Sequence, residues 1–173
     1  TTMRAIVDLD NYYCAFPQLT TSGGKGSKVR IYWAESLFTG NELIPHLNWE
    51  KPVKKNRNEI ESKYFEGMGD TFLPDGGDCR VFDTLWWEAG RYLELFVSTG
   101  DEPLQIDDFC IRETHYPYSL DYKFECDDPR FESVTPIATR VLEMCSHETY
   151  MDCPYYEQLM YVGDTRLEVL TTY

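Results

Sequence analysis

The sequence has 173 residues, of which 42% are hydrophobic and 27% are charged, as in an ordinary globular protein long enough to bury a core. Its 30 acidic residues outnumber its 16 basic residues, and the formal net charge of −14 argues against binding to nucleic acid or to an anionic membrane surface. Aromatic residues make up 15% of the chain, a supply that suits β-strands and also sites that hold flat apolar or sugar surfaces.

The first 127 residues carry the pattern of short β-strands. Apolar side chains recur at every second position in residues 5–9, 29–33 and 93–97, which is typical of half-buried strands. The glycine-rich stretch SGGKGS forms a turn before the second of these, and another strand-like run starts at Leu104. This pattern predicts an antiparallel β-sandwich over residues 1–127, with the polar residues 39–64 as a loop.

The pattern changes to helical spacing after Asp127. Asp128 and Pro129 are suited to the cap and the first position of a helix, and Thr165 to Glu168 have the form of a capping box that opens a second helix. Two helices cannot enclose a core of their own, so we expect the chain to be a fragment that contains a β-sandwich and the first helices of a larger helical domain. The apolar stripe of the first helix comprises Phe131, Val134, Ile137, Ala138, Val141, Leu142 and Cys145.

Six cysteines lack the spacing of zinc ligands, so we expect free thiols and no metal site. No apolar run is long enough to span a membrane, and the initial residues TTMRAIVDLD do not resemble a signal peptide. The location stays open: periplasmic or secreted if a larger parent carried an export signal, and cytoplasmic otherwise.

The segment YMDCPYYEQLMYVGDTR, residues 150–166, contains Asp152, Glu157 and Asp164. Acids are no denser here than the composition predicts, but their neighbours are mostly aromatic and apolar. Acids in such surroundings tend to lose water, which raises a carboxyl pKa toward the range of a useful general acid. The residues alone allow a functional carboxylate cluster, a solvated or structural face, or a calcium site, although the EF-hand spacing is missing.

The stretch DCPYYEQLMYVGDTR resembles the signature near the start of the catalytic domain in α-L-rhamnosidases, glycoside hydrolase family 78. Two upstream stretches, NRNEIESKYFEGMGDTFLPDGG and LWWEAGRYLELFV, resemble the β-sandwich that precedes the catalytic barrel in that family. The resemblance covers essentially the whole chain in the right order. It implies a β-sandwich supporting domain at residues 1–127, and the first helices of a truncated (α/α)6 barrel at residues 128–173.

The resemblance also implies an activity, the hydrolysis of terminal α-L-rhamnosides with inversion and without a cofactor. Glu157 matches the general acid, and Asp152 and Asp164 match residues that hold rhamnose hydroxyls. Tyr161 stands where the family often has an aromatic residue, commonly Trp. The implied partners are a rhamnose-containing glycoside or polysaccharide and the remainder of the barrel. The family's general base is a glutamate much later in the barrel, so we expect this chain alone to be inactive.

A rival hypothesis from another class is a non-catalytic carbohydrate-binding or structural β-sandwich module. In that case the helical tail would serve as a clamp between domains, and any sugar binding would reside in residues 1–127.

Overall fold

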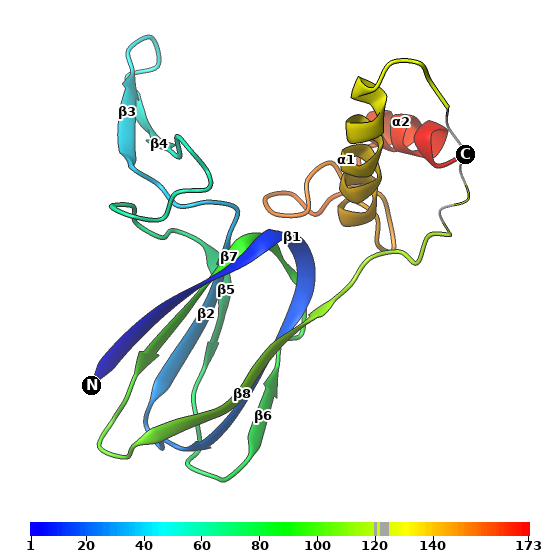
Figure 1. The fold of residues 1–173 in the computed structure, drawn as a ribbon. Helices are drawn as coiled ribbons and strands as arrows, with labels where there is room; N and C mark the ends of the chain where they lie inside the picture. The colour runs from blue at the N-terminus through cyan, green and yellow to red at the C-terminus, as the bar shows by residue number, and fades with distance from the viewer. Residues whose placement is uncertain (120, 122–124) are drawn as a thin grey trace. The chain divides into compact units, whose positions relative to one another are not determined.

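The structure is a computed structural model that describes residues 1–119, 121 and 125–173 and divides into two compact units, Thr1–Arg112 and Glu113–Tyr173 (Figure 1). Unit 2 carries the helices α1 (Arg130–Met144) and α2 (Val162–Thr172). Unit 1 is built from strands β1 (Thr2–Gly23), β2 (Lys28–Ala34), β3 (Gly40–Ile44), β4 (Trp49–Val53), β5 (Met68–Phe72), β6 (Arg80–Asp83), β7 (Glu88–Ser98) and β8 (Leu104–Glu113), the last of which ends at the boundary.

Six strands of unit 1 form one curled antiparallel sheet in the order β5-β2-β7-β1-β6, with β8 also paired to β1. Strand β1 pairs first with β7 and then, from Gln18 to Thr21, with β6. The register shifts between Asp8 and Tyr13, where Asp10 has a φ of 63°, and the ribbon of β1 bends near its middle (Figure 1). The predicted β-rich, antiparallel fold is confirmed. The bend, however, produces a half-barrel instead of two stacked sheets.

The predicted alternation in β2 and β7 is confirmed by the core of unit 1. Val29, Ile31 and Trp33 are at most 1% exposed, and the paired residues Leu93, Leu95 and Val97 are at most 7% exposed. The opposite face of β7 carries Glu94, which is 3% exposed and accepts hydrogen bonds from Arg4 Nε at 2.5 Å and Arg30 Nη2 at 2.7 Å. Both faces of the central strand are therefore covered, one by apolar packing and one by ion pairs.

Residues 39–64, which we expected to form a loop, contain the two-stranded hairpin of β3 and β4. Most of its residues are exposed, on both faces of the ribbon. A ribbon without a buried face produces no apolar alternation, and the sequence pattern therefore did not reveal it.

Both predicted helices exist, but they start at other residues than expected. Helix α1 begins at Arg130, and the Asp128 carboxylate accepts the Arg130 backbone N–H at 3.0 Å. Helix α2 begins at Val162, and the Thr165 N–H donates to the Tyr161 carbonyl at 2.9 Å. The predicted capping box at Thr165–Glu168 is therefore wrong, since Thr165 already lies inside the helix.

No (α/α)6 barrel is evident among the described residues of unit 2. Four residues of the predicted apolar stripe on α1, namely Phe131, Val134, Ile137 and Val141, are 46% to 65% exposed. Neither helix of the described ranges is long and apolar enough to cross a membrane. All six cysteines are free.

The compact units divide after Arg112, whereas the sequence placed a domain boundary after Asp127. Residues just after β8 are bonded to the end of α1: the Tyr116 N–H donates to the Ser146 carbonyl at 2.8 Å, and His147 Nε2 donates to the Thr114 carbonyl at 3.1 Å. These bonds, which lie within unit 2, explain why the segment after β8 belongs to the helical unit.

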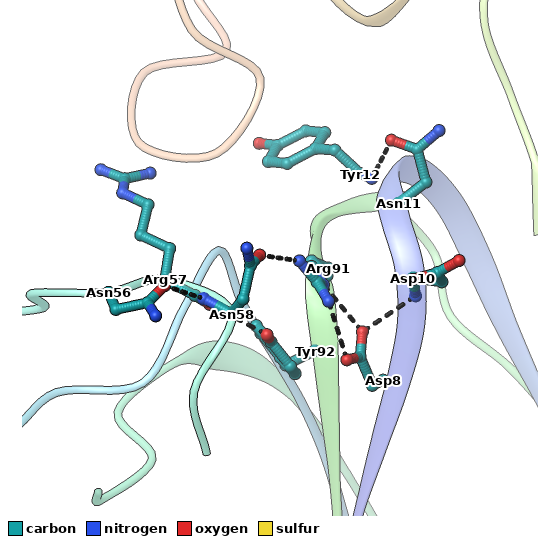
Figure 2. A network of polar contacts seen from close by, with 9 residues as sticks. All are labelled: Asp8, Asp10, Asn11, Tyr12, Asn56, Arg57, Asn58, Arg91 and Tyr92. Carbon is teal, nitrogen blue, oxygen red and sulfur yellow. Dashed lines mark hydrogen bonds and ion pairs between the residues drawn. The ribbon is translucent and has the colours of Figure 1, made fainter.

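A polar network in unit 1 fixes the bend of β1 to β7 and to the loop after β4 (Figure 2). Asp8 accepts two bonds from Arg91, from Nε at 2.8 Å and from Nη2 at 2.9 Å, and Arg91 also donates to Asn58. Next to it, the Tyr92 hydroxyl donates to the Arg57 carbonyl at 2.9 Å. The bidentate bond to Arg91 lowers the pKa of Asp8 and raises the pKa of Arg91.

We predict that Asp8→Asn destabilises unit 1 by about 0.5–1 kcal/mol at pH 7, a small effect because the pair is partly exposed. The folded pKa of Asp8 lies below its ordinary value of 3.8, so its contribution is complete above that pH and is lost as the pH falls through the folded pKa. Urea unfolding of the wild type and of Asp8→Asn, followed by tryptophan fluorescence at pH 7 and near pH 3, measures the difference in free energy of unfolding at each pH. A loss of equal size at both pH values, or the same loss in an Asp101→Asn control, would contradict it.

Candidate functional site

The segment between α1 and α2 is held by buried side chains. Cys145, Met151 and Tyr155 are at most 8% exposed. The Met151 N–H donates to the Cys145 carbonyl at 2.9 Å, and the Gln158 N–H donates to the Cys153 carbonyl at 2.8 Å. These contacts fix a compact, non-helical backbone between the two helices, and Pro154, which lacks a backbone N–H, is compatible with it.

Hydroxyl groups tie the two helix ends of unit 2 to this segment. The Tyr118 hydroxyl donates to Ser146 Oγ at 2.8 Å, and Ser146 Oγ donates to the Leu142 carbonyl at 2.6 Å. The Tyr150 hydroxyl bonds to Thr172 Oγ1 at 2.9 Å. The backbone that carries the predicted site residues is thus attached at the end of α1 and at the end of α2.

The predicted site residues lie on the exposed side of this segment. Asp152, Glu157 and Asp164 are exposed, and Tyr161 is 43% exposed. We expected acids enclosed by tyrosines, but only Tyr155 is buried, and Tyr156 is 62% exposed with its ring edge-on to Tyr155 at 4.6 Å. The acids are exposed because the buried residues Met151 and Tyr155 occupy the interior side of this segment, and the acids lie on its outer side.

The structure nevertheless brings the four predicted residues together. Interaction with the nearby carboxylate of Glu157 is the main cause that raises the pKa of Tyr161, and the charges of Asp152 and Asp164 add to this effect. Residues up to twelve positions apart therefore share one electrostatic environment. Such a cluster can accept hydrogen bonds from hydroxyl groups and can deliver a proton from one carboxyl group.

The sequence analysis missed one acid of this site, Glu168. Burial, followed by the charges of Asp164 and Asp152, raises its pKa. The thiol of Cys145 lies in the same environment: burial first, and then Glu168, Cys153 and Asp152, raise its pKa to about 11. The sequence pattern placed Glu168 in a capping box that starts at Thr165. An α2 that starts at Val162 places it one turn after Asp164 instead, on the same side of the helix.

The described residues contain no group of three or more His, Cys, Asp or Glu side chains placed to hold a metal ion.

Two solved structures are similar to this chain. A rhamnosidase of glycoside hydrolase family 78 from Bacillus sp. GL1 matches 99% of the chain with a TM-score of 0.69 and 20% identity, and the match covers 16% of that protein. A rhamnosidase from Klebsiella oxytoca, solved with rhamnose bound, matches 98% of the chain with a TM-score of 0.60 and 16% identity, and the match covers 32% of that protein.

No protein-family model and no curated protein sequence matches the chain. At the identities of the two structural matches, the likeness establishes the fold and leaves the roles of individual residues open. The chain spans less than a third of the length of either rhamnosidase. It therefore resembles one portion of those enzymes.

We predict that Glu157→Gln lowers the titration midpoint of the Tyr161 phenol toward the ordinary value of 10.0, because it removes the nearest negative charge. NMR of ¹³Cζ-labelled tyrosine in the 173-residue chain reports this directly. The matched control is Glu132→Gln, an exposed acid in the first turn of α1. If the Tyr161 midpoint is the same in both variants, the two side chains are not neighbours in solution.

Proposed function

We propose that this chain is the portion of an inverting α-L-rhamnoside hydrolase, of the glycoside hydrolase family 78 type, that supplies the general acid. The observation that carries the proposal is that Glu157, Asp152 and Asp164, all exposed, lie close enough to Tyr161 for their charges to act on it. Two further findings support it. The chain matches the fold of two rhamnosidases over nearly its whole length, and the acids occur within the family-like stretch DCPYYEQLMYVGDTR.

In this proposal Glu157 protonates the glycosidic oxygen as the bond to the leaving group breaks. Tyr161 lies close enough to Glu157 for the carboxylate to act on its hydroxyl group, and in this proposal it lines the sugar site beside the acid. Asp152 and Asp164 accept hydrogen bonds from sugar hydroxyls, for which two ionised carboxylates are strong acceptors.

We assign no general base to these residues. Inversion requires a second carboxylate on the opposite face of the sugar, about 6.5–9.5 Å from the acid, with room for a water molecule between them. The described acids beside Glu157 lie on one side of unit 2 and are assigned to the sugar. The base would come from the part of the enzyme that this chain does not match.

We further propose that α1 and α2 are the first helices of an (α/α)6 barrel. The apolar stripe of α1 is uncovered in unit 2, with Ile137 65% exposed and Val141 55% exposed. An amphipathic helix gains most of its stability when that stripe packs against other helices. Additional barrel helices would cover the stripe.

In an enzyme that contains this chain and the remainder of the barrel, we predict that Glu157→Gln lowers turnover of alkyl and glycosyl rhamnosides by about 10²- to 10⁴-fold. The loss should be much smaller for an aryl rhamnoside with a very good leaving group, which needs little protonation. Steady-state kinetics on both substrates, with Glu132→Gln as control and circular dichroism as a check of the fold, test this. An equal loss on both substrates would exclude the general-acid role.

The 173-residue chain alone is predicted not to hydrolyse rhamnosides, because the proposal leaves it without a general base. The measurement is release of 4-nitrophenol from its α-L-rhamnoside by the purified chain. The Glu157→Gln variant, purified in the same way, gives the background. Activity of the chain above that background would refute the prediction.

A further inference from the structure

Glu168 is the half-buried carboxyl group of the site, and the structure holds it firmly. It lies on α2, four residues after the exposed Asp164. Its backbone carbonyl accepts hydrogen bonds from Thr171 Oγ1 and Thr172 Oγ1, both at 2.8 Å. Thr172 Oγ1 in turn bonds to the buried segment through Tyr150. The backbone of the helical turn that carries Glu168 is therefore attached to the buried segment.

One oxygen of the Glu168 carboxyl group is buried without a hydrogen-bond partner. Within the described ranges, no donor reaches Oε2, which is shielded from solvent. Only this oxygen of the Glu168 carboxyl group is buried in that way, and the side chain as a whole is half-buried. An oxygen that is shielded from water and has no donor makes the ionised form more costly, which favours the protonated form of Glu168.

The charges around Glu168 also favour its protonated form. Asp164 faces it from its own helix, Asp152 from the segment between the helices, and Cys145 from the end of α1. No arginine or lysine in the described part of the chain forms an ion pair with Glu168, Asp152 or Asp164, and Arg166 lies two positions away, on another side of α2. Two carboxylates without a cation nearby oppose a third negative charge.

We propose that Glu168 is a positioning residue of the acid site: as a neutral carboxyl group behind Asp152 and Asp164, it allows both to carry their charge toward a sugar. The inference rests on the proposed function for the role of the two aspartates. When Glu168 ionises at higher pH, the third charge repels the carboxylates of Asp152 and Asp164, which displaces them from the positions in which they accept hydrogen bonds from the sugar.

The first test measures the coupling in the 173-residue chain, without any catalysis. Carboxyl ¹³C NMR should show Glu168 titrating above its ordinary value of 4.5, and both Asp152→Asn and Asp164→Asn should lower its midpoint by about 0.5–1 pH unit. The exposed Asp127→Asn is the matched control and should leave the midpoint in place. An unshifted Glu168 in both variants would overturn the proposal, whatever Glu157→Gln does to turnover.

The second test uses the enzyme that contains the rest of the barrel. For the wild type, KM for an aryl rhamnoside should rise about three- to tenfold as the pH passes through the Glu168 midpoint. Glu168→Gln, which cannot ionise, should abolish this rise, and Glu168→Asp should restore it. A merely structural role would change stability without this pattern. KM profiles that coincide in the wild type and Glu168→Gln would overturn the proposal even where the NMR coupling is present.

Discussion

The buried anchors of the segment between α1 and α2 constrain everything else in the site. Cys145, Met151 and Tyr155 face the interior of unit 2, and backbone bonds close the segment around them. Asp152 directly follows the anchor Met151 and Glu157 lies two residues after the anchor Tyr155, and both acids are exposed. The arrangement of the acids is thus a consequence of apolar packing. Loss of an anchor would scatter the carboxylates without altering any of them.

Two groups of acids in this chain differ in whether an arginine is bound to them. Asp8 and Glu94 in unit 1 are bound by arginines, and their oxygens are largely occupied by those bonds. In the described part of unit 2, Asp152, Asp164 and Glu168 have no such cation. A carboxylate without a cationic partner costs stability, yet it keeps its acceptor capacity for a ligand. Under the proposed function, Asp152 and Asp164 would use this capacity to bind a sugar.

The sequence predicted what depends on local periodicity and missed what depends on tertiary structure. The alternation of Val29, Ile31 and Trp33 corresponds to a strand with one buried face, and the apolar stripe from Phe131 corresponds to helix α1, although most of that stripe is exposed. The bend of β1 at Asp10 has no such period. Glu168 was missed because a difference of three residues in the start of α2 decides whether it caps a helix or joins the acids.

The two units differ in how complete they are. Unit 1 has a core in which Trp33 and Leu93 are fully buried, whereas α1 in unit 2 leaves Phe131 and Ile137 uncovered. Helices that pack against this stripe would add the stability that unit 2 lacks. If they belong to a barrel, they would also bring a second carboxylate to the sugar and remove water from the acids. In the proposed enzyme, the helices that complete the fold would therefore also complete the catalytic site. The exposure of the acids in this chain is consistent with that proposal, because the covering helices belong to the rest of the barrel.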